Sequence, residues 1–168
     1  NVLKRAKELA NKGEELFATK PLKYFLYNQI NEENFSDETL KMFSKLDDYD
    51  ILSAIKEWIH HPDKVLSLLS EMIINRKLFR IEIQKEEISK EKQEKKKTKF
   101  LEKINISEKE VNYFVFTQKI SNQAYSLEKP IFILNKKGKL IDISKASDQL
   151  NLQALTKPVI KHIFCYPK

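Results

Sequence analysis

Apolar residues near the start of the chain recur every three to four positions, the spacing of one face of an α-helix. Residues 2–12 follow this pattern, and Gly13 stands where a helix commonly ends in a left-handed residue. The next segment is ambiguous. Residues 16–19 and 22–27 flank a Lys-Pro pair, and their aromatic residues favour a β-hairpin, with a helix starting at Pro21 as the alternative.

The middle of the chain predicts three further helices and a strand. The first is capped by Ser36 or Asp37 and runs to about residue 46, and the second is capped at residues 47–48. The third starts near Pro62 and ends near residues 75–77, and residues 78–83 then alternate like a strand with one buried face. The apolar side chains that these helical patterns bring to one face are Leu40, Met42 or Phe43, Leu46, Tyr49, Ile51, Leu52, Ile55, Trp58, Ile59, Val65, Leu66, Leu68, Leu69, Met72 and Ile73.

Residues 85–103 form a run of mixed charge with eight Lys and five Glu, so its net charge is only +3. Mixed signs with apolar residues at the ends predict an exposed helix with one narrow apolar seam. A partly disordered linker is the alternative interpretation.

The last third of the chain is rich in β-strand patterns. The strands are expected at 111–117, 130–134, 140–143 and 159–166. Residues 135–138 form a hairpin loop in which Gly138 supplies a positive φ, and residues 144–155 form a short helix capped by Ser147 or Asp148.

Together these patterns predict an α+β fold: N-terminal helices followed by a helix-flanked, mainly antiparallel β-rich part. Three regions are expected. Residues 1–84 form a helical region, residues 85–104 a charged helix or linker, and residues 105–168 a small α+β part.

Composition narrows the classes of function. The 168 residues carry a net charge of +7, which favours anionic partners without choosing among nucleotides, nucleic acids and acidic proteins. Only two glycines occur, and neither belongs to a glycine-rich phosphate loop.

The single cysteine, Cys165, excludes an internal disulfide and fits a cytoplasmic protein. No apolar run is long enough for a membrane span. The chain begins without Met in a helical pattern, which favours a piece of a longer protein.

Several groups of residues resemble sites, and each has a structural interpretation that we prefer. The sequence His60-His61-Pro62-Asp63 offers metal ligands, but adjacent histidines on a helix diverge, so a corner between two helices is expected. Asp47, Asp48 and Asp50 lack the glycine and spacing of a calcium loop and are expected to cap a helix. We therefore predict no catalytic and no metal-binding residue among them.

Two further candidates are interpreted as core. Cys165 and His162 are three apart in a predicted strand and so face opposite sides, which excludes a nucleophile–base pair between them. The aromatic residues of 111–117 superficially resemble an RNA-binding strand, but a core role is expected. Basic residues cluster at Lys4, Arg5 and Lys7 and again at Arg76, Lys77 and Arg80, and among them the Arg5 guanidinium suits phosphate.

Three segments resemble one enzyme family. They are LKRAKELANKGEELFATKPLKYFLYNQI (3–30), LDDYDILSAIKEWIHHPDKVLSLLSEMIINRKLFRIEI (46–83) and NLQALTKPVIKHIFCYPK (151–168). They are similar to the region downstream of the catalytic domain in bacterial HD-superfamily phosphohydrolases, the group that includes dGTP triphosphohydrolases and the eukaryotic SAM- and HD-domain dNTPase.

The resemblance implies a parent enzyme that binds a divalent metal through an H…HD…D set and hydrolyses a dNTP to the nucleoside and tripolyphosphate. This chain has no His-Asp dipeptide, so the motif is expected before Asn1 and the isolated chain is expected to be inactive, with no cofactor of its own. The implied role is accessory: packing on the upstream HD domain, assembling a homo-oligomer, and contributing basic residues to a regulatory dNTP site. Lys4 and Arg5 are the candidates for those nucleotide-phosphate contacts.

Two alternatives remain open at this point. The charge of +7 also suits a stand-alone nucleic-acid-binding module, whose affinity would fall steeply with salt. The Lys/Glu helix at 85–103 also suits a protein-interaction module that uses this helix as its docking surface.

Overall fold

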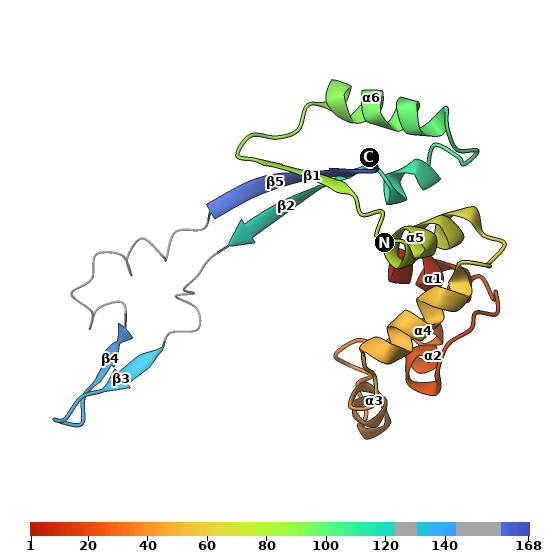
Figure 1. Ribbon diagram of the computed structural model, residues 1–168. Helices are drawn as coiled ribbons and strands as arrows, with labels where there is room; N and C mark the ends of the chain where they lie inside the picture. The colour runs from red at the N-terminus through yellow and green to blue at the C-terminus, as the bar shows by residue number, and fades with distance from the viewer. Residues whose placement is uncertain (123–130, 144–158) are drawn as a thin grey trace. The chain divides into compact units, whose positions relative to one another are not determined.

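The computed structural model describes residues 1–122, 131–143 and 159–168. The chain forms two compact units. The helical unit consists of Asn1–Arg80, Gln93–Phe116 and Cys165–Lys168, and the sheet unit consists of Ile81–Lys92 and Thr117–Phe164. This arrangement confirms the predicted α+β class, with helices preceding mainly antiparallel strands (Figure 1).

The helical unit begins with α1 (Val2–Asn11), which ends where predicted because Gly13 adopts a φ of +86°. The next element, α2 (Lys20–Tyr27), is a helix with Pro21 in its first turn. The hairpin interpretation of this segment was therefore wrong and the helical alternative correct. Pro21 fits the first turn because the amide hydrogen that it lacks has no partner there.

The predicted capping residues begin the next helices. The Ser36 hydroxyl accepts a hydrogen bond from the Thr39 amide at the start of α3 (Asp37–Phe43). Asp47 and Asp50 form a reciprocal capping box at the start of α4 (Asp48–Trp58), in agreement with the prediction that these carboxylates cap a helix.

The core of the helical unit is built around Trp58, which is buried and donates its indole hydrogen to the Phe17 carbonyl over 3.0 Å. Val65 and Leu66 of α5 (Lys64–Ile74) and Leu9 of α1 are fully buried as well. Fewer apolar side chains are buried than the apolar pattern predicted. The apolar side chains on α3, α4 and α5 that prove exposed are Leu40, Phe43, Tyr49, Leu52 and Ile73. Short helices turn only part of their apolar surface toward their neighbours.

The charged run contains α6 (Lys90–Leu101), so the helical interpretation of this segment is confirmed over those residues. None of its side chains is fully buried, and Lys97 pairs with Glu94 one turn earlier at 3.0 Å. A 3₁₀ turn, η1 (Glu110–Tyr113), occupies the first part of the strand predicted at 111–117, and the strand that is present begins only at Phe116. The prediction was wrong over residues 111–115, because Val111, Phe114 and Val115 are spaced to bury one side of a turn in the core.

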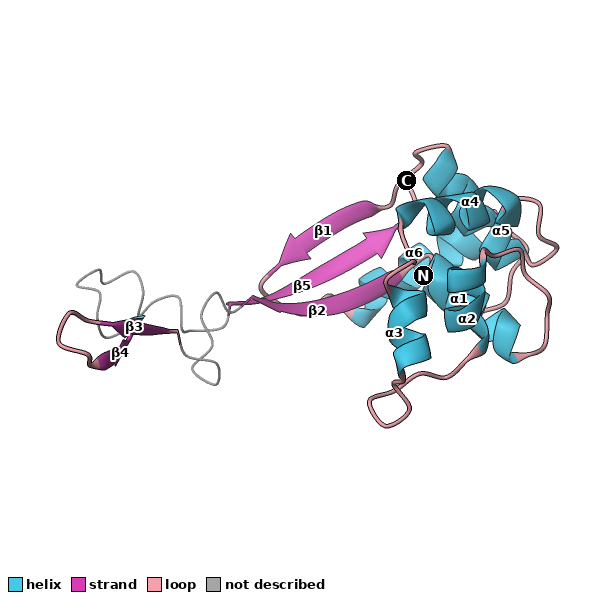
Figure 2. Cartoon of the chain, turned by 90° about the horizontal axis from the view of Figure 1, so that it is seen from below, coloured by secondary structure: helices cyan, strands magenta, loops and turns pink. Residues whose placement is uncertain are grey.

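Three strands, β1 (Arg80–Gln84), β2 (Phe116–Asn122) and β5 (Val159–Tyr166), pair in the order β1-β5-β2. Most of their residues belong to the sheet unit, but Arg80, Phe116, Cys165 and Tyr166 at their ends belong to the helical unit. Figure 2 shows β5 running opposite to both neighbours. The strand prediction at 78–83 is confirmed in part, but its apolar face is not buried: Ile81 and Ile83 are exposed.

A second antiparallel pair joins β3 (Phe132–Leu134) to β4 (Leu140–Asp142), with Ile133 opposite Ile141. The loop between them has Gly138 at a φ of +74°, as predicted. The predicted helix at 144–155 lies outside the described residues. Within the described ranges, no helix combines the length and the apolar character needed to cross a membrane.

Candidate functional site

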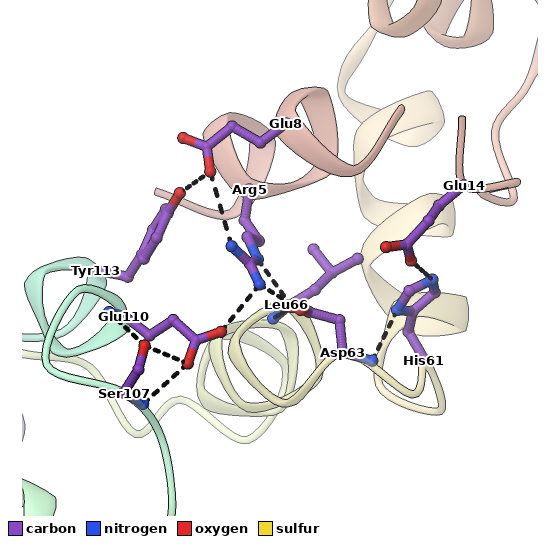
Figure 3. Close-up of polar contacts among 9 residues, drawn as sticks. All are labelled: Arg5, Glu8, Glu14, His61, Asp63, Leu66, Ser107, Glu110 and Tyr113. Carbon is purple, nitrogen blue, oxygen red and sulfur yellow. Dashed lines mark hydrogen bonds and ion pairs between the residues drawn. The ribbon is translucent and has the colours of Figure 1, made fainter. Parts of the chain in front are cut away.

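The most elaborate polar arrangement in the helical unit surrounds Arg5 on α1. Its Nε donates to Asp63 Oδ1 over 3.0 Å, and its Nη2 donates to Asp63 Oδ2 over 2.5 Å and to Glu110 Oε1 over 3.1 Å. Figure 3 shows the guanidinium enclosed by these carboxylates, with Glu8 on the same helix 3.7 Å from Nη1. Arg5 therefore makes a bidentate pair with Asp63 and ties α1 to two distant segments.

Asp63 has two structural roles. It precedes α5, and its Oδ1 accepts the Leu66 amide hydrogen over 2.8 Å, which caps that helix. The Asp63 amide donates to His61 Nδ1 over 3.1 Å, and His61 Nε2 lies 3.9 Å from Glu14. The predicted corner between two helices is thus present, with Pro62 between His61 and Asp63.

Glu110 is held from its other side by Ser107. The Ser107 amide and hydroxyl donate to Glu110 Oε2 over 2.9 and 2.7 Å. Tyr113 lies one turn later, and its hydroxyl donates to Glu8 (Figure 3). The Arg5 guanidinium carbon lies 5.5 Å from the centre of the Tyr113 ring, within cation–π range.

These contacts fix the charge state of the network. The hydrogen bond with Asp63 raises the pKa of Arg5 further, so it stays charged. Burial raises the pKa of Asp63, but the hydrogen bonds from Arg5 and Leu66 and the Arg5 charge outweigh it and hold the pKa below its ordinary value. The two bonds from Ser107 lower the pKa of Glu110, and burial, followed by the Glu8 bond, raises that of Tyr113.

A recess of about 390 Å³ lies beside this network. It is lined by Asn1, Lys4, Arg5, Glu8, Lys109, Glu110, Asn112 and Tyr113. Lys4 is exposed and its Nζ lies 5.8 Å from the centre of the Tyr113 ring, with no carboxylate bound to it among the described residues. Lys4 and Arg5 thus line one recess in different states. The Lys4 ammonium is available to an anion, whereas the Arg5 donors already have carboxylate partners.

The remaining basic candidates are dispersed. Lys7 donates to the carbonyls of Phe25 and Asn28, over 2.7 and 2.6 Å, which fastens α1 to the end of α2. Lys77 lies 3.8 Å from Glu71. Cys165 is buried, and burial raises the pKa of its thiol, as expected for an unreactive core cysteine.

Metal ligation finds no support in the described part of the chain. No three His, Cys, Asp or Glu side chains gather there in positions that could hold an ion. His61 and Asp63 are committed to the helix corner, and Asp47 and Asp50 to the capping box. The residues present therefore do not fit the divalent metal that the family resemblance implies.

Sequence reasoning missed Glu110 and Tyr113. Glu110 is separated from Arg5 by 105 positions, and no pattern in the chain links them. The sequence indicated only that Asp63 belongs to a corner between two helices. Its bidentate pairing with Arg5, 58 positions away, was not predicted. The available signal was local: Ser107 three residues before Glu110 is a capping-box pattern.

Comparison with known proteins gives a clear relative among solved structures. No protein-family model matches the chain, and no curated protein matches it. The crystal structure of a phosphohydrolase from Bacteroides thetaiotaomicron VPI-5482 is similar, with a TM-score of 0.78 and 42% sequence identity. The match covers 99% of this chain but only 42% of that protein. The chain is therefore related in sequence and fold to a part of a phosphohydrolase.

Proposed function

We propose that this chain is the accessory part of a metal-dependent HD-type phosphohydrolase that acts on deoxynucleoside triphosphates. The observation that carries the proposal is the asymmetric coverage. At 42% identity, the match takes in 99% of this chain and 42% of the phosphohydrolase. A segment of this kind needs no active site of its own if the rest of the enzyme supplies the catalytic groups.

The histidines of this chain support the proposal that the catalytic groups lie in another segment of the enzyme. The chain has three histidines and no His-Asp dipeptide, so it lacks the H…HD…D set that holds the metal in HD enzymes. Two of the three, His60 and His61, lie at the corner between α4 and α5. In this proposal the metal and its activated water belong to the catalytic segment, and this chain contributes no ligand to them.

The proposed contribution of this chain is structural and regulatory. The Arg5 network holds α1 against the N-terminus of α5 and against η1. In this proposal α1 is a rigid attachment point for the segment that connects it to the catalytic part. The recess beside it presents Lys4, and we propose that Lys4 contacts the phosphates of a bound dNTP in a homo-oligomer, with Arg5 joining it through Nη1, which lies 3.7 Å from Glu8 and so beyond hydrogen-bond distance.

The most direct test is to sequence the coding DNA upstream of Asn1. The proposal expects an open reading frame that carries H…HD…D and continues into Asn1 without a stop. A stop followed by a start codon immediately before Asn1 would overturn it and favour a stand-alone basic module instead.

A chimera tests the accessory role itself. This chain would replace the matching 42% of the Bacteroides phosphohydrolase, and hydrolysis of dNTPs and of phosphomonoesters would be measured. We expect the chimera to retain the hydrolase activity of the parent, while a deletion of the same segment loses it. A deletion protein that is folded and fully active would refute the accessory role, and so would dNTP hydrolysis by this chain alone. A chimera that cleaves phosphomonoesters but releases no tripolyphosphate from dNTPs would refute the proposed substrate class.

A further inference from the structure

A second recess in the helical unit lies between α6 and the C-terminal residues. Its volume is about 490 Å³, within the range of small-molecule sites. Its lining consists of Arg80, Lys96, Lys99, Phe100, Lys103, Ile104, Val115, Tyr166, Pro167 and Lys168. Figure 1 shows α6 and the C-terminal end of the chain at this place. No lining residue is shared with the recess beside Arg5.

The charged side chains of this recess are all of one sign. Five of its lining residues have cationic side chains, namely Arg80, Lys96, Lys99, Lys103 and Lys168, and none has an acidic side chain. None of the five makes an ion pair with a carboxylate in the part of the chain that the structure describes.

Two other lysines on the same helix make ion pairs: Lys92 pairs with Glu82, and Lys97 pairs with Glu94 at 3.0 Å. Lys90 and Lys95, which lie outside the recess, make none in the described part of the chain. The lysines of the recess are therefore distinguished by their convergence on one lining and not by the lack of an ion pair.

The unpaired lysines are also close to one another. Lys96 and Lys99 lie one turn apart on the same face of α6, and Lys103 follows in the turn just after the end of this helix. Like charges at this spacing repel one another and slightly destabilise a helix. An anion bound among them would remove that repulsion.

The wall behind the cations is apolar and well packed. Tyr166 and Val115 are buried, and the Phe100 ring lies 4.9 Å from that of Phe114. Lys96 Nζ sits 4.0 Å from the centre of the Tyr166 ring, which keeps this ammonium at the recess. Several cations beside an apolar wall suit a ligand with several phosphates and a flat apolar group.

We propose that this recess binds an organic polyphosphate of nucleotide size, with its phosphates on Lys96, Lys99, Lys103 and Arg80 and its ring system beside Phe100. Charge-assisted hydrogen bonds from lysine and arginine are the strong contacts that phosphates use in proteins. The proposal does not rest on the accessory role in a phosphohydrolase, because it uses only residues of the helical unit. A nucleic acid is less well matched, because the cations converge on one recess instead of following a long track.

Isothermal titration calorimetry on the full chain tests this directly, with ATP, inorganic tripolyphosphate and adenosine as the probes. The diagnostic variant is Lys96→Glu/Lys99→Glu. The matched control is Lys90→Glu/Lys95→Glu, which makes the same change of charge on the same helix outside the lining. Circular dichroism and the melting of Trp58 fluorescence establish that both variants are folded.

We expect ATP to bind the wild-type chain, the control to stay within about threefold, and the diagnostic variant to bind at least about 100-fold more weakly, since two charge-assisted contacts are lost. Tripolyphosphate should bind more weakly than ATP, and adenosine more weakly still.

Four results would overturn the assignment. One is the absence of ATP binding by the folded wild-type chain at millimolar concentration. Another is equal weakening of both variants, which would indicate a diffuse effect of net charge. Tripolyphosphate binding as tightly as ATP would remove the role given to the apolar wall and leave an inorganic polyphosphate site. Tight binding of single-stranded DNA or RNA that ATP cannot displace would identify a nucleic-acid surface instead.

Discussion

Replacing Arg5 by Met separates the charge of this side chain from its bulk. Arg5 is 8% exposed, and its guanidinium is bound to Asp63 and Glu110. Methionine retains much of the aliphatic stem but none of the donors. Asp63, whose side chain is only 13% exposed, would then keep a buried negative charge with no cation beside it.

The magnitude follows from the cost of an unpaired buried charge. Removing one partner of a buried ion pair typically destabilises a protein by about 3–5 kcal/mol. Asp63 keeps its hydrogen bond from the Leu66 amide, and the Glu110 side chain is 30% exposed and keeps its bonds from Ser107. We therefore expect the lower end of that range, a loss of about 3 kcal/mol in the free energy of unfolding at neutral pH.

The assay is urea unfolding followed by the fluorescence of Trp58, the single tryptophan, which is buried in the same unit as Arg5. The control is Lys4→Met, which also replaces a cationic side chain by methionine but at the neighbouring exposed position, and which should shift the unfolding free energy by less than about 0.5 kcal/mol. A double-mutant cycle with Asp63→Asn, which keeps the capping oxygen, measures the coupling, expected at about 1–3 kcal/mol.

The pH dependence supplies an independent check. The folded-state pKa of Asp63 is lowered, so its contribution is present above its unfolded pKa, about 3.9, and is lost as the pH falls through the folded value. In Arg5→Met the two contributions of Arg5 are lost, while burial, the capping bond and the smaller effect of His61 remain, so protonation of Asp63 relieves the variant. The stability difference between the two proteins should therefore shrink below about pH 4.

The reasoning is refuted if Arg5→Met loses less than about 1 kcal/mol with an unchanged urea dependence, or if the difference between the proteins is the same at pH 3 and pH 7.

Three other predictions follow from the described contacts. Phe114→Ala should lower the unfolding free energy by about 3–5 kcal/mol in the same urea assay, because Phe114 is fully buried; a loss below about 1 kcal/mol would contradict its place in the core. Asp47→Ala should cost about 1 kcal/mol by removing the capping box of α4, and an equal loss in Asp48→Ala would argue against a capping effect. Cys165 should react with a thiol reagent at pH 7 much more slowly in the folded chain than in urea, since burial raises the pKa of its thiol; equal rates would mean that the thiol is open to solvent.

The sequence predicted helices best where a capping residue and apolar spacing agreed. Ser36 and Asp47 both begin helices as expected, and Gly13 follows the end of another. Predictions failed where an aromatic or β-branched run was interpreted as a strand. The segment at 22–27 is helical and that at 111–113 is a 3₁₀ turn. Aromatic and β-branched residues favour strands only weakly, and packing against neighbours overrides that preference.

The two recesses were open to prediction to different degrees. The lysines at 96, 99 and 103 can be placed on one helical face from their spacing alone. Arg80 and Tyr166 can be placed beside them only from the fold, because they come from distant segments. For Arg5 the sequence suggested an available phosphate ligand, whereas the structure shows a guanidinium bound by carboxylates from α5 and η1. Phosphate contacts by Lys4 and Arg5 stay a prediction.

By itself, the sequence determined the α+β class, the beginnings of the capped helices and the absence of an HD motif from this chain. Helix caps and periodic apolar faces depend on residues three or four positions apart, so neighbouring positions in the sequence are enough to predict them. Only the tertiary structure decided that Arg5 meets Asp63 and Glu110, or that five cations converge on one recess. Those pairings depend on how elements far apart in the sequence pack together. The sequence around a charged residue therefore does not indicate which partner it will meet.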